Sequence, residues 1–557
     1  MAINHFINQP PNPSDEDRYK LLKRALSNAG REEDFNNIIK LLSPPPDILN
    51  YSPPGSLKGR KIGVIGAGVA GMAAAFELRK LGCDITIFEA NDERIGGRIY
   101  THYFDEDKKL YGELGAMRIP VSHESVWHYI NLFKLNTDVF IQRDPNGFIY
   151  VKNTRIRNYH GEIEKHFYPK FNLTTAERNT SWRDLYDYAM NSPMKNLSPY
   201  VRSEILKILS VYNPEYAPLL NISLRQNFEF LGLSPGAIQL ITSVDPTLSP
   251  LMDISYNHLL SQNYPVDLEY VYEIEGGLSN LPLAFYNSLT TETPKEYTNQ
   301  EMDSLGIVKW KLGYWVSGIY KSEDSDKVFI KYNNKNSTEK SYEKFDYVVC
   351  AIPYSTLRTV EIEPVFSNIK MQAIKELNYV DSQKTLFLCK NRFWEEDAEY
   401  GGINGGNSLT DMSIINIIYP SDHAYGGKPS DPGVLIASYN QAREAIYLGN
   451  TDPEVHNEIV KRQVEIVHGL PNEYLDSIVQ DSKYLNWNNE QWSRGAVCKY
   501  SPEQKRIFGD SLLKPEYNCR VFFAGEHVSS TPSWIQGSLY TGKLAANDLA
   551  KVARNRS

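Results

Sequence analysis

Three glycines near the start of the chain have the types and spacing of a phosphate-binding turn. Gly66, Gly68 and Gly71 follow a short β-rich run, 61–65, and precede an apolar stretch with helical spacing. At such a junction the first glycine permits a tight turn, the second lets the backbone approach a diphosphate, and the third lets helix and strand pack closely. The N–H groups of the first helical turn, which holds Ala70, would face the phosphates.

The residues around the end of the next β-rich run fit the same purpose. Glu89 ends that run, with Ala90 beside it, and Gly96-Gly97-Arg98 follows. A carboxylate at this place accepts hydrogen bonds from ribose hydroxyls and repels a 2′-phosphate, which favours FAD or NAD over NADP. Paired glycines followed by a cation allow a close approach to the same phosphates.

The elements that must position these residues are visible as patterns. Residues 61–89 predict a β-α-β unit, and the apolar runs FDYVVCAIP and RVFFAGEH are typical of strands buried on both faces of a parallel sheet. Residues 160–262 have a mainly helical pattern, in which SPYVRSEILKILSVY and SPGAIQLITSV open on Ser-Pro pairs suited to helix starts. We therefore expect an α/β (mixed α+β) fold, with a discontinuous Rossmann-like cofactor domain, a mixed-sheet substrate domain and a helical domain.

Composition excludes several classes of protein. The 557 residues predict two to four structural units, and the net charge of −9 argues against nucleic acid as a partner. Five scattered cysteines without a CxxC pair exclude a disulfide scaffold, and no cluster has metal-ligand spacing, so no metal site is expected. We see neither a signal peptide nor 18 consecutive apolar residues, and expect a cytoplasmic protein without a membrane span. The length permits a homo-oligomer.

Further motifs make the chain similar to the flavin-dependent amine oxidase family. That family places GxGxxG, the strand-end Glu and GGR in this order. Its W-x-x-x-x-[YW]-x-x-G run resembles residues 487–495, and its closing segment resembles FAGE at 523–526 and SWIQG at 533–537. The resemblance covers about 61 to 550. It implies a bound FAD and places four residues of the closing segment at the cofactor: Gly525, Glu526, Trp534 and Ile535.

The run ELGAMRIP, residues 113–120, resembles the L-amino-acid oxidase branch of that family. In that branch the arginine of the run, here Arg118, forks onto the substrate carboxylate. A planar guanidinium suits bidentate carboxylate binding better than a lysine does. The resemblance also places Gly115, Ala116 and Met117 at the flavin.

The resemblance implies roles for residues farther along the chain. Lys384 matches the family lysine that reaches flavin N5 through a water and assists the reaction with O2. Trp534 would flank the flavin near the substrate Cα, Tyr419 would give its hydroxyl to the substrate carboxylate, and Val316 would meet the adenine. Position 496 is Ala where mammalian monoamine oxidases carry the cysteine that bonds to flavin, so FAD is expected to be non-covalent.

We expect seven segments along the chain. The N-terminal extension holds a helix that Ser14 and Asp17 can cap. The segments are 1–60 (N-terminal helical extension), 61–110, 263–365 and 481–557 (FAD-binding), 111–155 and 366–480 (substrate-binding), and 156–262 (helical).

Together these residues predict oxidative deamination of L-amino acids to 2-oxo acids, with release of ammonia and H2O2, by hydride transfer from Cα to flavin N5. The rivals are an L-amino-acid 2-monooxygenase that forms an amide, an amine or polyamine oxidase, and a flavoprotein without catalysis. The preferred amino acid stays open, although acidic residues such as Asp253, Asp267 or Glu269 could select a cationic substrate.

Overall fold

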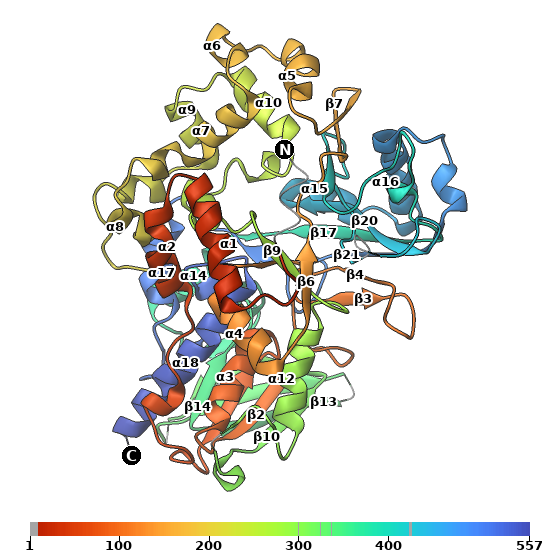
Figure 1. The fold of residues 1–557 in the computed structure, drawn as a ribbon. Coiled ribbons are helices and arrows are strands. Elements are labelled where there is room, and N and C mark those ends of the chain that lie inside the picture. Colours follow the sequence, from red (N-terminus) through yellow and green to blue (C-terminus); the bar gives the residue numbers. More distant parts are fainter. Residues whose placement is uncertain (1–8, 299, 324, 336, 423–425, 557) are drawn as a thin grey trace.

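A parallel five-stranded sheet, the central sheet, lies in the lower part of the molecule in Figure 1. The computed structural model describes residues 9–298, 300–323, 325–335, 337–422 and 426–556. The strands are, in their order across the sheet, β10 (Val308–Leu312), β2 (Asp84–Glu89), β1 (Lys61–Ile65), β14 (Tyr347–Cys350) and β23 (Val521–Phe523). They come from three distant parts of the chain, as expected for a discontinuous Rossmann-like domain.

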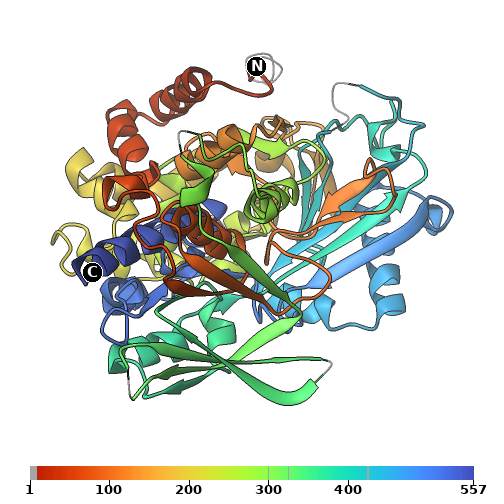
Figure 2. The same ribbon diagram turned by 90° about the horizontal axis from the view of Figure 1, so that it is seen from below.

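Helices cover one face of this sheet and a second sheet covers the other (Figures 1 and 2). Helix α3 (Val69–Arg79) packs so closely against α18 (Ile535–Asn555) that a Cβ on Gly542 would lie 2.3 Å from the Ala70 carbonyl oxygen. On the opposite face, a Cβ on Gly63 would meet the side chain of Ile330 at 2.7 Å. The second sheet contains β13 (Ser337–Phe345), β12 (Val328–Asn334), β11 (Tyr314–Lys321) and β15 (Glu361–Glu363).

A larger mixed sheet lies to one side of the central sheet (Figure 1). Its order is β21 (Val479–Asn486), β17 (Ser382–Cys389), β20 (Gly433–Gln441), β19 (Asn416–Ile418), β18 (Asn407–Thr410), β7 (Phe148–Val151) and β8 (Thr154–Arg157). Helices α15 (Ala442–Gly449) and α16 (Pro453–His468) accompany it. Smaller sheets contain β5 (Ile119–Pro120), β9 (Val271–Ile274) and β6 (Thr137–Phe140); β3 (Thr101–Tyr103) and β4 (Tyr111–Glu113); and β16 (Tyr379–Val380) and β22 (Val497–Cys498).

The remaining helices include the group predicted between residues 160 and 262. It contains α5 (Glu162–His166), α6 (Thr175–Arg178), α7 (Trp182–Lys195), α8 (Pro199–Arg202), α9 (Leu224–Phe230), α10 (Pro235–Val244) and α11 (Tyr256–Asn263). Elsewhere lie α1 (Asp15–Asn28), α2 (Phe35–Leu42), α4 (Glu124–Phe133), α12 (Asn280–Thr290), α13 (Tyr354–Leu357), α14 (Asn368–Glu376) and α17 (Gln504–Leu512). Among the described residues, no helix has the length and apolarity to cross a membrane. The seven segment boundaries stay a prediction.

One predicted helix is wrong. The stretch that opens at Ser198-Pro199 contains only the four residues of α8 and a 3-10 turn, Ser203–Leu206, before Lys207 becomes extended. Hydrogen bonds to side chains replace the helical ladder: the Asn213 N–H donates to the Glu204 carboxylate at 2.8 Å. The second Ser-Pro start, in contrast, opens the ten-residue helix α10.

The described part of the N-terminal extension, residues 9–60, is docked on the body of the protein. The capping box of Ser14 and Asp17 starts α1, as predicted. Arg18 on this helix is buried and forms an ion pair with Glu124 of α4 at 2.5 Å. The Gln536 side chain of α18 donates to the Leu42 carbonyl oxygen at 2.6 Å. The extension is therefore part of the folded core.

Candidate active site

A cavity of about 690 Å³ opens at the carboxyl ends of the central strands. In parallel α/β sheets this edge is where ligands bind. The cavity collects residues from one end of the chain to the other. Lys384 and every residue predicted at the cofactor, Gly71 excepted, line it: Gly66, Gly68, Ala70, Glu89, Ala90, Gly97, Arg98, Gly115, Ala116, Met117, Arg118, Val316, Gly525, Glu526, Trp534 and Ile535.

The three glycines at the turn between β1 and α3 differ in what surrounds them. Gly66 has φ +101°, a conformation that L side chains rarely adopt. A Cβ on Gly68 would have no protein atom within 4 Å, because that position faces the cavity. A Cβ on Gly71 would lie 2.1 Å from the Gly66 carbonyl oxygen. Gly71 therefore stays outside the cavity and allows helix and strand to pack.

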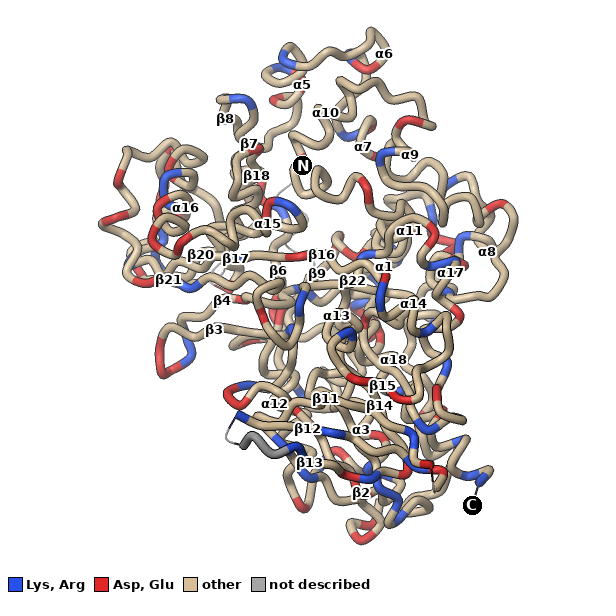
Figure 3. The backbone as a smooth tube through the Cα atoms, turned by 180° about the vertical axis from the view of Figure 1, so that it is seen from behind, with Lys and Arg blue, Asp and Glu red and all other residues tan. Residues whose placement is uncertain are grey.

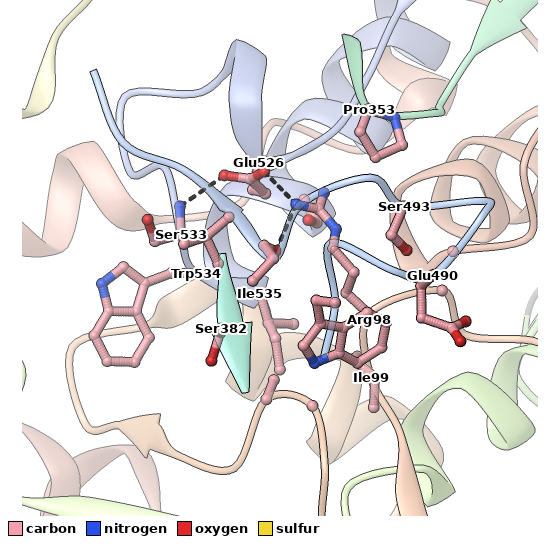
Figure 4. Close-up of a pocket in the computed structure, with 18 of the residues that line it drawn as sticks. Arg98, Ile99, Pro353, Ser382, Glu490, Ser493, Glu526, Ser533, Trp534 and Ile535 are labelled. Carbon is pink, nitrogen blue, oxygen red and sulfur yellow. Dashed lines mark hydrogen bonds and ion pairs between the residues drawn. The ribbon is translucent and has the colours of Figure 1, made fainter. Parts of the chain in front are cut away.

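Two carboxylates frame the cavity near this turn. Glu89 accepts hydrogen bonds from the Ala67 and Asn91 N–H groups, each at 2.9 Å, and burial raises the pKa of Glu89 despite these bonds. Glu526 accepts from the Arg98 guanidinium at 2.7 Å and from the Ser533 N–H at 2.7 Å (Figure 4). Burial alone would lower the pKa of Arg98, but the ion pair with Glu526 raises it. Arg98 is thus held as a cation at the cavity wall.

Arg118 is a partly buried cation without a protein counter-ion. Its Nε has no hydrogen-bond partner, and no ion pair joins it to a carboxylate in the part of the chain that the structure describes. Its guanidinium carbon lies 5.2 Å from the centre of the Phe140 ring, and burial lowers its pKa. A partly desolvated cation with no protein counter-ion is stabilised by an anionic ligand that pairs with it. The site is therefore suited to an anion.

Lys384 projects from β17 toward the loop that carries Arg118. Its Nζ donates to the carbonyl oxygens of Glu113 at 3.0 Å and Gly115 at 2.7 Å, and lies 3.4 Å from the Met117 sulfur. Burial lowers the pKa of Lys384, and Arg118 lowers it further, although Glu113 opposes both. The amine is therefore fixed at the cavity and is easier to deprotonate than a lysine in water.

Trp534 stands at the N-terminus of α18, where the backbone is constrained. The preceding Ser533 has φ +73°, and the Ser533 N–H donates a hydrogen bond to the Glu526 carboxylate. The indole packs edge-on against His123, with ring centres 4.9 Å apart, and its Nε1 has no partner. These contacts fix an aromatic wall beside the other site residues.

The expected role of Tyr419 is wrong. Its hydroxyl lies 2.7 Å from Ser408 Oγ and 2.9 Å from His468 Nε2, inside a core behind the sheet and outside the cavity. The sequence around Tyr419 does not determine which tyrosine faces the cavity. Tyr439 of β20 lines the cavity instead, opposite Lys384 in the strand register. The strand pairing is the signal that would have found it.

None of the three acidic residues considered as substrate selectors lines the cavity. The Asp253 side chain is 94% exposed, and Glu269 is half-exposed with Arg143 3.7 Å away. Asp267 is buried and accepts a hydrogen bond from Ser122. Selection among substrates must therefore come from other residues.

Comparison with known proteins identifies the relatives of the chain. The family described as flavin containing amine oxidoreductase matches residues 69–550. An L-amino-acid oxidase of Pseudechis australis is 27% identical over 544 residues, which cover 96% of this chain and 94% of that protein. One of Vipera ammodytes ammodytes is 28% identical over 502 residues, covering 88% and 92%.

Solved structures share the fold. Putrescine oxidase bound to putrescine superimposes with a TM-score of 0.66 at 17% identity, covering 89% of this chain and 99% of that one. Cyclohexylamine oxidase from Brevibacterium oxydans IH-35A gives 0.63 at 17% identity with the same coverage.

The relatives correct one expectation and establish the family. The cytoplasmic placement is wrong, because the relatives from P. australis, V. ammodytes ammodytes and Bothrops atrox are secreted snake venom L-amino-acid oxidases. A family match that spans most of the chain, together with a cavity lined by the family motifs, leads to one conclusion: the chain belongs to the flavin containing amine oxidoreductases.

Proposed function

We propose that this protein is an FAD-dependent L-amino-acid oxidase. It would convert an L-amino acid, O2 and water to a 2-oxo acid, ammonia and H2O2. The relatives named L-amino-acid oxidase support this activity, and their similarity extends over nearly the whole chain. The observation that carries the proposal is Arg118, a partly buried guanidinium at the cavity with no protein carboxylate to pair with among the described residues.

The residues present fit a non-covalently bound FAD. The open space at Gly68 leaves room for a diphosphate at the start of α3, and Arg98 supplies a cation beside it. Glu89 disfavours a 2′-phosphate. Ala496 lines the cavity, whereas all five cysteines lie outside its lining, so no thiol is positioned to bond to the flavin.

A bound flavin would supply the chemistry of accepting a hydride from the substrate Cα and passing the electrons to O2. The chain's own residues bind and orient the substrate. Arg118 forks onto the α-carboxylate, and Tyr439 donates its hydroxyl to the same group. Trp534 closes one side of the site and keeps water away from Cα. Lys384 would supply a positive charge or a proton to the reaction of the reduced flavin with O2.

Anaerobic titration tests the proposal. L-amino acids should bleach the visible flavin band, whereas their D-forms and the matching decarboxylated amines should not. Bleaching by the amines alone would contradict the role of Arg118. In air, the products should be a 2-oxo acid and H2O2 in equal amounts; an amide with CO2 would identify a monooxygenase instead.

A further inference from the structure

A further buried cation, Lys499, lines the cavity on a different wall from Arg118 and Lys384. Lys499 directly follows β22, where alternate residues face opposite sides. Val497 and Lys499 line the cavity, whereas Cys498 between them is fully buried and its N–H faces Glu526 at 3.2 Å. The Ser533 hydroxyl donates to the Cys498 carbonyl oxygen at 2.9 Å, which ties this wall to Trp534.

Lys499 differs from the other buried lysines in having no partner. The Lys370 ammonium donates to the Leu512 carbonyl oxygen at 2.7 Å, and that of Lys505 to Ile205 at 2.8 Å. Lys384 donates to two carbonyl oxygens. Lys499 is only 4% exposed, yet its ammonium has neither a hydrogen bond nor an ion pair with any residue that the structure describes.

The charge of Lys499 is available to a ligand. Burial lowers its pKa to about 8 although Glu526 opposes the shift, so the ammonium form still predominates at neutral pH. Glu526 itself is occupied, because it accepts from Arg98, Ser533 and the Cys498 N–H. The Lys499 ammonium is therefore free to pair with an anion in the cavity.

A further carboxylate of the cavity does not compensate Lys499. Both oxygens of Asp245 accept hydrogen bonds, from Thr247 at 2.5 Å and from Tyr186 at 3.3 Å. Asp245 is satisfied within the protein, whereas Lys499 is not.

We propose that Lys499 determines substrate specificity by binding a second carboxylate, so that the preferred substrates are dicarboxylic L-amino acids such as L-glutamate or L-aspartate. The inference rests on the proposed function for the reaction itself. Arg118 would bind the α-carboxylate, and Lys499 the side-chain carboxylate. A charge-assisted hydrogen bond that is lost in the matching amide corresponds to about 10- to 100-fold in affinity.

The first test compares flavin reduction by matched substrates. In the wild-type holoenzyme, the ratio of reduction rate constant to Kd should be about 10- to 100-fold higher for L-glutamate than for L-glutamine, or for L-aspartate than for L-asparagine. Lys499→Met should abolish this preference while keeping reduction by the amide. Lys20→Met, which removes one exposed positive charge from α1, should keep the preference. Equal ratios in wild type and Lys499→Met would overturn the proposal.

The second test does not depend on turnover. Glutarate has both carboxylates but no amine, and its binding can be measured as a perturbation of the flavin spectrum. Its Kd should rise about 10- to 100-fold in Lys499→Met, whereas that of pentanoate should not change.

If the Kd of glutarate rises in Lys499→Met but no amino acid reduces the flavin, the oxidase proposal fails and the dicarboxylate site stands. If neutral amino acids are preferred and glutarate binds no better than pentanoate, the dicarboxylate site fails alone. If Lys499→Met does not fold, the wild-type preferences and Lys499→Arg, which keeps the charge, decide the question.

Discussion

Arg118 gains its selectivity from geometry as well as charge. Lys would keep the charge but lose the bidentate fork, whereas Met would leave an apolar wall. We expect Arg118→Met to lower kcat/KM for L-amino acids about 100-fold or more, and Arg118→Lys to lower it by less, because a charge-assisted contact contributes about 1.5–3 kcal/mol. The measurement is kcat/KM for the best L-amino acid beside its decarboxylated amine. An unchanged ratio between these two substrates in both variants would contradict carboxylate binding by Arg118.

Lys384 should leave a signature in the pH dependence of stability. Its pKa is lowered in the folded protein, so between this pKa and the unfolded value of about 10.4 the unfolded chain binds more protons. The contribution of Lys384 to the free energy of unfolding therefore rises with pH through this window. The substitution Lys384→Met removes this pH-dependent contribution to the free energy of unfolding.

We expect the Tm of Lys384→Met, relative to wild type, to be higher at pH 7.5 than at pH 9.5. Thermal unfolding of both proteins at the two pH values measures this difference. The Lys20→Met variant, which alters a lysine 67% exposed, is the control for surface charge. A difference that does not depend on pH would mean that Lys384 titrates normally.

The two tyrosines show what a motif can and cannot predict. The residues around Arg118 and Trp534 form contiguous motifs, so their numbers follow from the sequence. A tyrosine on a separate strand belongs to no contiguous motif, and a shift in strand register changes which residue faces the cavity. Tyr439 is defined by its pairing with Lys384, and the partner of Tyr419 is His468, 49 residues away.

At the scale of elements, the turn between β1 and α3 separates binding from packing. Gly68 has φ −73°, an ordinary value, and an added methyl group would enter only the cavity. Gly68→Ala should therefore fold normally but retain less flavin. Gly71→Ala should destabilise the protein, because its Cβ would press on the Gly66 carbonyl oxygen.

Flavin content after gel filtration and the Tm of the flavin-free protein measure these two effects separately. We expect the apoprotein Tm of Gly68→Ala to match wild type and that of Gly71→Ala to fall by several degrees, roughly, for a cost of about 1–3 kcal/mol. Normal flavin retention by Gly68→Ala would place the diphosphate elsewhere.

The two Ser-Pro starts explain why one helix was predictable and the other was not. Both Ser198 and Ser234 cap as expected. After Ser234 the helix continues because its apolar residues fall on one buried face. In the segment that follows Ser198, a tight turn buries Ile205 and Leu206. The Lys505 ammonium, from a distant helix, donates a hydrogen bond to the Ile205 carbonyl oxygen of this turn. Tertiary contacts of this kind override local propensity and cannot be predicted from the segment alone.

The N-terminal extension depends on a buried ion pair between α1 and α4. Arg18→Met leaves Glu124 without its cation and should cost about 3–5 kcal/mol of stability. Pairing it with Glu124→Gln should recover part of the loss, because no charge then stays buried. Denaturant unfolding of the two single variants and the double variant gives the coupling energy. Additive effects would show that the pair does not hold the extension.

At the scale of the whole molecule, the order of the elements could be predicted but their meeting point could not. Strands from three parts of the sequence form one sheet. The buried apolar pattern of β1, β2, β14 and β23 is typical of such strands, whereas β10 is only partly buried. Charged residues of both signs are scattered along the described chain (Figure 3), so no stretch of a single sign points to the site. Lys499 has no motif, and only the folded structure brings it to the cavity.

The cofactor should stabilise this assembly as a whole. The cavity is lined by the turn after β1, the end of β2, the loop after β14 and the start of α18, so a ligand there joins all three sequence segments of the central sheet. A ligand that binds only the folded state adds about 4 kcal/mol at a concentration 1,000 times its Kd. We expect the flavin-free protein to unfold at a Tm lower by several degrees, roughly. Added FAD should restore the Tm. FMN should not, because it lacks the adenosine moiety that Glu89 and Val316 would contact. Equal restoration by FMN would show that only the flavin half is bound and would remove the role assigned to the turn between β1 and α3.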